Sequence, residues 1–449
     1  MTAFDRFDPF DPLEQRVLAA IDEIAAPRRP EYLDDVLQLT ARSTQRPRWA
    51  FPGRWLPFMD TTLARGSSAR TPTRTFLVLV AVALLALAAG AIVISGARPR
   101  VPAPVGPAVN GSLVYPAQGD IWLRDSITAS DPGHPVVTGD GTQTAPYLSP
   151  DGRTFAFVET RPDGDWMMAA NVDGTNPRAI LHEPILAGWS QWSWSLDSTH
   201  VLVSGDFAGG VRKLFNVAAD GSGATEITYD GLIPWDAFWS TVDPDVFVLR
   251  AQRMSGVQPQ DLYIASVSGH SLRPLGLVGQ SSFGPRYTLA GAAWSPDGTT
   301  IAYNSWANAD DGSLRTSMRV HLVNVDGTND RAVASIDDPV VNEAWPVFSP
   351  DGTHLLIQRF VFPTGPSSAD GSGWIAIMPG DGSAVARDIG ARIDRTQNPD
   401  TIKGWSPDGT QILQRIDATA KTYLVDPATG DATELPWAED MPDWQRRAR

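Results

Sequence analysis

Histidine is the first residue type to weigh, because its imidazole can hold a metal ion or move a proton near neutral pH. The sequence contains six of them, at His134, His182, His200, His270, His321 and His354. None forms the His-x-His or His-x-x-x-His spacing that presents two metal ligands together on one strand or helix. The acidic turns at 310–312, 326–330 and 337–338 also lack the spaced oxygen ligands of a calcium loop. We therefore expect no metal ion and no cofactor.

Nucleophilic catalysis has as little support. Cysteine is absent, which excludes disulfides, zinc–thiolate sites and thiol catalysis. The Gly-x-Ser-x-Gly elbow that presents the serine of many hydrolases does not occur either. The formal net charge of −15 argues against nucleic acid as a partner, because proteins that bind it carry a basic surface. The sequence thus predicts no catalytic residue and favours a binding protein over an enzyme.

Most of the chain repeats one pattern: an aromatic residue, a Ser-Pro-Asp-Gly turn and a run of β-forming residues. The copies read YLSPDGRTFAFV from Tyr147, WSLDSTHVLVS from Trp194, WSTVDPDVFVLR from Trp239, WSPDGTTIAYNS from Trp294, FSPDGTHLLIQ from Phe348 and WSPDGTQILQR from Trp405. Their serines lie 45 to 57 residues apart. Asp-Gly supplies the positive φ that tight hairpins need, and each copy holds four short strands. Self-similarity at this period predicts an all-β fold, a β-propeller.

The pattern W-S-P-D-G-x-x-I-A-Y/F, followed by a strand and the turns NVDGTN at Asn171 and NVDGTND at Asn324, resembles the TolB-type, WD-like propeller repeat. The resemblance covers residues 111–445 and implies a propeller used mainly for binding proteins. The second strand of each copy begins near residue 112, 153, 200, 246, 300, 354 or 411, which predicts seven blades, with six or eight as alternatives. Ser112 starts a strand without an inner neighbour, and residues 441–445 form an inner strand without a follower. We expect these two ends to complete one blade and so close the ring.

Loop length distinguishes the two faces of the predicted propeller. Tight turns lie on one face, and the long connections at 252–260, 276–289, 306–318, 361–373 and 391–402 lie on the other. Long loops on a rigid scaffold are where binding usually resides, with neutral drift as the alternative. The candidate partner-binding residues on this second face are Trp189, Trp192, Trp235, Phe283, Arg286, Tyr287, Asn342, Glu343 and Arg395. Aromatic and arginine side chains are the usual anchors of protein interfaces.

A membrane span is predicted from the run FLVLVAVALLALAAGAIVI at residues 76–94, which contains no charge. As a helix this run would be about 28 Å long, close to the hydrocarbon thickness of a bilayer. A buried core helix is the alternative. Four arginines lie within residues 54–74 and two within 96–100, so the positive-inside rule places the N-terminus in the cytosol. The predicted transmembrane helix occupies residues 75–95.

Residues 1–74 are expected to form a cytosolic segment with two short helices, beginning near Asp11 and Pro30. Between Gln45 and Asp60, aromatic residues alternate with arginines, which fits either an interfacial membrane anchor or a clamp for a cytosolic protein. This layout resembles that of membrane-bound anti-sigma factors, but without the His/Cys zinc motif of many of them. A cytosolic protein partner of residues 1–60 is therefore a further hypothesis. Residues 96–110 form a Pro-rich linker, and 446–449 a C-terminal tail.

Together these features predict a membrane-anchored, extracytoplasmic β-propeller that binds or senses a protein or ligand without catalysis and signals to its cytosolic segment. The linker enters on the face of tight turns, so the partner is expected on the membrane-distal face. The alternative is a propeller enzyme that acts on an exported small molecule or glycan in the central channel. A buried pair of carboxylates with a histidine at the centre would favour the enzyme.

Overall fold

The computed structural model describes residues 103–130, 132–186, 191–254, 261–268, 271–277, 292–308, 314–365 and 368–448. All of them lie in the second of the two compact units into which the chain divides, Met1–Gly96 and Ala97–Arg449. The predicted cytosolic segment (1–74), the predicted transmembrane helix (75–95) and the first part of the predicted linker fall outside the described residues. Within the described ranges, no helix is long and apolar enough to cross a membrane.

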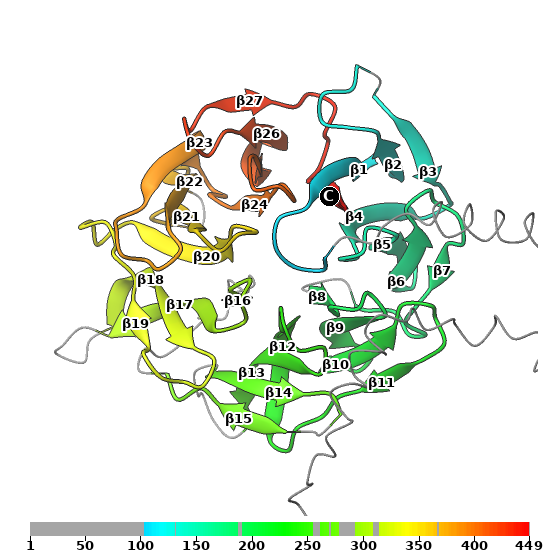
Figure 1. The fold of residues 1–449 in the computed structure, drawn as a ribbon, viewed down its shortest axis with the longest axis horizontal. Helices are drawn as coiled ribbons and strands as arrows, with labels where there is room; N and C mark the ends of the chain where they lie inside the picture. The colour runs from blue at the N-terminus through cyan, green and yellow to red at the C-terminus, as the bar shows by residue number, and fades with distance from the viewer. Residues whose placement is uncertain are drawn as a thin grey trace, which may run out of the picture. The chain divides into compact units, whose positions relative to one another are not determined.

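The described residues form an all-β ring of seven four-stranded sheets (Figure 1). The prediction of seven blades is confirmed, and the alternatives of six and eight are excluded. We letter the strands of each blade a to d from the centre of the ring outwards. The a–b and c–d turns lie on one side of the ring, the turn face. The b–c connections and the d–a connections between blades lie on the other side, the loop face.

The blades are numbered around the ring, and the strands of each blade follow in the order a to d. Blade 1 consists of β28 (Asp443–Arg447), β1 (Val109–Ala117), β2 (Asp120–Arg124) and β3 (His134–Val137); blade 2 of β4 (Thr142–Leu148), β5 (Thr154–Arg161), β6 (Gly164–Asn171) and β7 (Arg178–Ala179); and blade 3 of β8 (Gln191–Trp194), β9 (His200–Phe207), β10 (Val211–Ala218) and β11 (Ala224–Glu226). Blade 4 consists of β12 (Leu232–Trp239), β13 (Val246–Arg253), β14 (Asp261–Ser266) and β15 (Leu272–Pro274); and blade 5 of β16 (Ala292–Trp294), β17 (Thr300–Asn308), β18 (Leu314–Asn324) and β19 (Arg331–Ala332). Blade 6 consists of β20 (Asn342–Phe348), β21 (His354–Val361), β22 (Gly371–Pro379) and β23 (Arg387–Thr396); and blade 7 of β24 (Thr401–Trp405), β25 (Ile412–Ile416), β26 (Lys421–Val425) and β27 (Ala432–Glu434).

Blade 1 joins the two ends of the domain. Its a strand, β28, comes from the end of the chain and pairs antiparallel with β1, with Leu113 opposite Trp444 and Val109 opposite Arg447. The predicted closure is therefore confirmed. The strand runs on to Arg447, so Arg446 and Arg447 belong to the sheet rather than to a tail, because β1 also begins early enough to pair with them.

The Ser-Pro-Asp-Gly turn between strands a and b is stabilised by hydrogen bonds within the turn itself. In blade 5, Ser295 Oγ donates a hydrogen bond to Asp297 Oδ1 (2.6 Å), which also accepts the backbone N–H of Thr299 (3.1 Å). Gly298 has φ +69°, a left-handed conformation that glycine adopts without strain. The hydrogen bond from Ser295 holds the pKa of Asp297 below its ordinary value. Equivalent Ser–Asp bonds of 2.6 to 2.7 Å occur in blades 2, 3, 6 and 7.

Four outer strands carry an arginine that grips the next blade on the turn face; we call these the arginine clamps. Each guanidinium donates to a backbone oxygen in the c–d turn of the following blade. The bonds run from Arg178 to Ala219 (2.9 Å), from Arg273 to Asp326 (3.0 Å), from Arg331 to Asp381 (2.7 Å) and from Arg387 to Pro427 (2.7 Å). Charged donors make stronger hydrogen bonds than neutral ones, so each clamp ties neighbouring sheets together at their outer edge.

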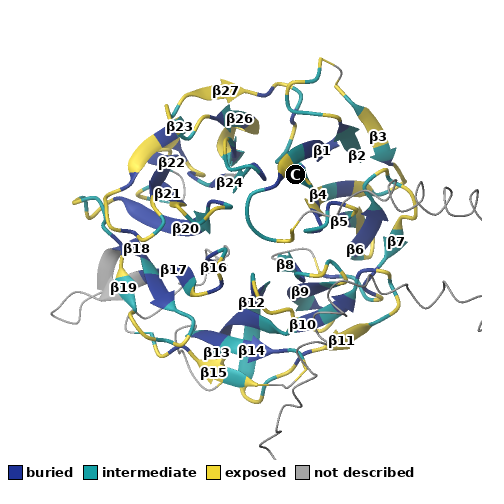
Figure 2. Cartoon of the chain, viewed as in Figure 1, coloured by how far each residue is buried: buried dark blue, intermediate teal, exposed yellow. Residues whose placement is uncertain are grey.

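The hydrophobic core lies between the blades, where the flat faces of neighbouring sheets meet (Figure 2). The tryptophans that open the repeat copies are buried at Trp194, Trp239 and Trp294 and half-buried at Trp405, and Trp444 on the closing strand is buried as well. Trp194 Nε1 also donates to the backbone oxygen of Tyr147 in the preceding blade (2.9 Å). The outermost strands, such as β11 and β27, are exposed. The ring is thus a rigid support for its surface connections.

Candidate functional site

The described connections of the loop face are shorter than the sequence indicated. β23 continues to Thr396 and β24 begins at Thr401, which leaves only residues 397–400 between blades 6 and 7. β17 and β18 extend to Asn308 and from Leu314, and β22 begins at Gly371. The expected loops at 391–402, 306–318 and 361–373 are therefore partly strand, because these hairpins keep pairing beyond the body of the sheet.

Four of the nine predicted partner-binding residues, Trp189, Phe283, Arg286 and Tyr287, lie outside the described residues, and their place on the loop face remains a prediction. The other five are described. Trp192 and Trp235 come from the inner strands of neighbouring blades 3 and 4, whereas Asn342, Glu343 and Arg395 all belong to blade 6. Trp192 is half-buried against the core between blades 2 and 3. Arg395 is exposed on β23, with φ +58°.

The structure corrects the prediction that Asn342 and Glu343 are exposed partner-binding residues, because neither lies on an exposed loop. β20 begins at Asn342, and the two residues are only 2% and 0% exposed. Glu343 Oε1 accepts from Nη2 and Nε of Arg359 on the paired strand, at 2.7 and 3.0 Å. Asn342 Oδ1 accepts the backbone N–H of Met318 in blade 5 (2.8 Å). Both residues hold strands together and cannot touch a partner; an inner strand that begins with polar residues reads as a loop in the sequence.

Trp235 does lie in a structured cluster on β12. The guanidinium carbon of Arg212 is 4.4 Å from the centroid of the indole ring, within range of a cation–π contact. Arg212 is itself held by two hydrogen bonds to the carboxylate of Asp206, at 2.8 and 2.7 Å. Below the ring, Asp236 and Arg250 form a fully buried ion pair whose shortest contact is 2.5 Å. These contacts hold the indole in one position.

A groove of about 150 Å³ adjoins this cluster between blades 3 and 4. Its lining includes Val211, Lys213, Tyr229, Leu232 and Met254. Val211 is 54% exposed and Met254 66% exposed, whereas the amine of Lys213 is paired with Glu183 (3.1 Å). Burial raises the pKa of Tyr229 to about 12, so its hydroxyl stays neutral. We call the lining residues Arg212, Val211, Tyr229 and Met254, together with Trp235, which adjoins the groove through its stack on Arg212, the Trp235 groove. An apolar rim around paired charges suits a protein side chain.

A second feature of the loop face is a pair of carboxyls next to the centre of the ring. Asp400 precedes β24 and Asp417 follows β25, and the backbone N–H of Asp417 donates to the backbone oxygen of Asp400 (3.3 Å). Burial and the neighbouring charge of Asp417 raise the pKa of Asp400 to about 6. Burial also raises the pKa of Asp417, although Arg415 lies 3.3 Å from it and opposes the shift. A carboxyl whose pKa is raised to about 6, as that of Asp400 is, can give or take up a proton near neutral pH.

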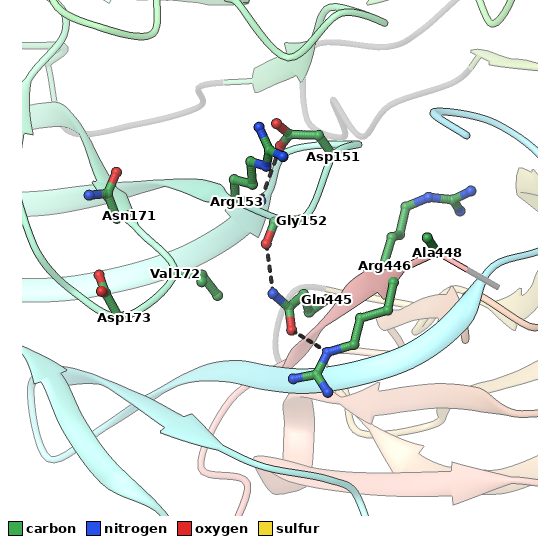
Figure 3. Close-up of a pocket in the computed structure, with 10 residues that line it drawn as sticks. Asp151, Gly152, Arg153, Asn171, Val172, Asp173, Gln445, Arg446 and Ala448 are labelled. Carbon is green, nitrogen blue, oxygen red and sulfur yellow. Dashed lines mark hydrogen bonds between the residues drawn. The ribbon is translucent and has the colours of Figure 1, made fainter. Parts of the chain in front are cut away.

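The turn face carries a pocket of about 580 Å³ at the seam of blade 1, between β28 and the turns of blade 2 (Figure 3). Blade 1 has no a–b turn, because its two inner strands come from opposite ends of the domain. Gln445 instead bridges the gap: its Nε2 donates to the backbone oxygen of Gly152 (2.8 Å), and its Oε1 accepts from Arg447 Nε (3.0 Å). No pattern along the chain indicated this pocket, because its lining residues lie almost 300 positions apart.

No family model matches the sequence, and no curated protein matches it. Solved structures do match the fold. An oligogalacturonate lyase in complex with manganese is 14% identical with a TM-score of 0.51, over 75% of this chain and 86% of that one. Oligogalacturonate lyase from Vibrio parahaemolyticus is 12% identical with a TM-score of 0.50, over 74% and 86%. TolB from Acinetobacter baumannii is 17% identical with a TM-score of 0.40, over 63% of each chain, so less than two thirds of that structure is spanned.

At such low identities these likenesses show the β-propeller fold alone, because one fold serves many functions. The TM-score of the TolB match is too low to carry an argument about this chain. The chain is thus a seven-bladed β-propeller by its own sheet topology, and its function must be argued from its surfaces.

Proposed function

We propose that the chain is a membrane-anchored, extracytoplasmic propeller that binds a protein partner on its loop face and does not catalyse a reaction. The observation that carries the proposal is the Trp235 groove. It combines a fixed Arg–Trp stack with two strongly exposed apolar side chains, Val211 and Met254. Such side chains gain most when a partner covers them, because burial removes apolar surface from water.

The membrane anchor of this proposal rests on the uncharged run at residues 76–94. The chain then enters the ring on the turn face, where the backbone N–H of Ala108 donates to the oxygen of Pro407 (2.7 Å) in the a–b turn of blade 7. In this proposal the loop face is the membrane-distal one. Signalling would then pass to residues 1–60, for which a cytosolic partner is part of the same proposal.

The test compares exposed apolar residues on the two faces. Val211→Asp combined with Met254→Asp places charge on the rim of the Trp235 groove. Val242→Asp combined with Val385→Asp does the same on the turn face, where these valines are 55% and 53% exposed. The full-length protein, cross-linked in its own membrane, should lose its partner only with the first pair, by about tenfold or more. Equal losses with both pairs, or no loss with either, would contradict a docking site on the loop face.

A second candidate function is an enzyme that acts on an exported small molecule or glycan, and the carboxyl pair Asp400–Asp417 favours it. A carboxyl whose pKa is raised to about 6 can serve as a general acid, while its partner serves as base. The test is to offer the purified protein a panel of oligosaccharides and follow product formation. Turnover that disappears in both Asp400→Asn and Asp417→Asn would establish the enzyme and displace the binding proposal.

A further inference from the structure

The first described residues, 103–108, lie outside the sheets, beside the centre of the ring. In Figure 1 they form the blue segment that reaches towards the middle of the ring and turns back into β1. They make no strand pairing, and Gly106, with φ +84°, bends the segment. Ala103 and Pro104 are exposed, whereas Ala108 is only 4% exposed. We call residues 103–108 the strap.

The strap is fastened at both ends to different blades. Nη2 of Arg446, on the inner strand of blade 1, donates to the backbone oxygens of Ala103 (3.0 Å) and Gly106 (2.6 Å). At the other end, the backbone N–H of Ala108 donates to the oxygen of Pro407 in blade 7. The strap is thus held by blade 1 at Ala103 and Gly106 and by the adjacent blade 7 at Ala108.

The guanidinium of Arg446 is partly buried, which is unusual for an arginine. It comes from β28, and its Nε is buried without a hydrogen-bond partner among the described residues. Burial lowers the pKa of Arg446, while the neighbouring Tyr147 and Asp443 oppose the shift. A guanidinium in such surroundings is costly unless its donors are used. The donors that are used hold the strap.

Tyr147 marks the space beside this contact. It lies near the end of β4, and 45% of its surface is exposed although the surrounding strands and Asp443 raise its pKa to about 12. Arg446 is close enough to oppose this shift, so position 147 lies beside the contact that holds the strap.

We propose that the strap covers the turn-face end of the ring axis and that Arg446 is the latch that keeps it closed. Opening the strap breaks the contacts of one arginine and leaves every sheet intact, so this segment opens far more readily than the ring. Arg446 thus has a conformational role, whatever binds the loop face: it decides whether the centre of the ring can be reached from the side of the linker.

The absence of cysteine from the sequence makes the test direct. Tyr147→Cys in the full-length protein provides a single thiol beside the latch, and the rate of its modification by a bulky maleimide is measured. Adding Arg446→Ala should raise this rate several-fold. Arg447→Ala is the matched control, because the neighbouring Arg447 binds Gln445 and Ser112 and not the strap. It should leave the rate unchanged.

A second variant separates the strap from the strand that holds it. Gly106→Val disfavours the positive φ of the strap and leaves β28 untouched, and no atom within 4 Å would meet the added Cβ. It should also raise the labelling rate several-fold at an unchanged melting temperature. Unchanged rates in Gly106→Val, or an equal increase with Arg447→Ala, would overturn the proposal. If Arg446→Ala unfolds the ring, Gly106→Val alone decides.

Discussion

The turn face and the loop face of the propeller are built on opposite principles. On the turn face the same contacts recur from blade to blade: the Ser–Asp bond of the a–b turn and the arginine clamps. Below the loop face, the buried polar groups are paired in more than one way, and only blade 6 repeats the buried carboxylate–arginine pair of blade 4 among the described residues. Blade 4 uses the ion pair Asp236–Arg250, whereas in blade 7 Gln414 donates to and accepts from the backbone of Ala391, at 2.7 and 2.8 Å.

This difference separates the contacts that stabilise every blade from those that distinguish one blade from another. Repeated contacts that use backbone acceptors define the ring and are visible as repeats in the sequence. Contacts that do not recur at the same position in every blade, such as the stack of Arg212 on Trp235, give one region a surface of its own. The following predictions test this division, from the largest expected effect to the smallest.

Blade 1, where the two ends of the domain pair, should be the part of the ring whose loss lowers stability most. Deleting residues 440–449 removes β28, leaves β1 with unpaired backbone groups and takes the buried Trp444 from the core. We expect this truncation to abolish cooperative thermal unfolding, measured by circular dichroism. Deleting only residues 448–449 should leave the melting temperature nearly unchanged. Similar small shifts in both truncations would show that the ring does not depend on its closing strand.

The polar groups below the loop face should come next. Asp236→Ala leaves Arg250 buried without its carboxylate and should lower the free energy of unfolding by about 3–5 kcal/mol. Asp394→Ala removes the partner of Arg392 in an exposed ion pair and should cost less than about 1 kcal/mol. Urea unfolding of both variants measures the contrast. If Asp236→Ala lowers the free energy of unfolding no more than Asp394→Ala does, the buried ion pair does not stabilise the ring.

The stability of the pairing in blade 1 should also depend on pH through Asp443 on β28. Its carboxylate accepts the backbone N–H groups of Leu148 (2.7 Å) and Trp444 (3.0 Å). Burial raises its pKa from 3.8 to about 7 despite these bonds. The folded carboxyl therefore binds a proton more tightly than the unfolded one, so its contribution is full below pH 3.8 and is lost as the pH rises to about 7. Asp443→Asn, which stays neutral, should flatten this part of the pH dependence of stability in thermal melts. The same slope in both proteins would contradict the assignment.

A single arginine clamp should have the smallest measurable effect on stability. Arg331→Ala removes the bond to the backbone oxygen of Asp381 and should lower the free energy of unfolding by about 1 kcal/mol, because that oxygen remains open to water. The control is Val340→Ser on the loop face, at a side chain that is 60% exposed, which should change stability by less than about 0.5 kcal/mol. If the two changes are equal in urea unfolding, the clamps are not what joins the outer edges of the blades.

Much of the fold could be predicted from the sequence because the a–b turn repeats with its aromatic residue. Seven blades and their closure follow from the copies and from the incomplete ends near Ser112 and Trp444. The arginine clamps were missed, although a signal was present: Arg178 and Arg331 each follow the glycine of the c–d turn by four residues. That spacing carries no meaning until the neighbouring blade is known.

The candidate site could be predicted only in part. Trp235 was found because it is an aromatic residue in a stretch that was expected to lie on the loop face, and the structure places it in a defined cluster on β12. Glu343 was misplaced because its partner, Arg359, lies on the next strand, and pairing across strands leaves no pattern along the chain. Arg212 and Met254 were missed for the same reason: they come from different blades, and only the folded ring brings them to one groove.

The arginine clamps have a consequence for how such a ring can change over evolutionary time. Each clamp grips a backbone oxygen, and every blade offers one whatever its side chains are. A duplicated or recombined blade would therefore find a compatible neighbour at once, and an individual blade can diverge without a matching change next door. Blade 4 shows this tolerance, because its a–b turn has lost the Ser-Pro-Asp-Gly pattern while its Arg273 still holds the c–d turn of blade 5.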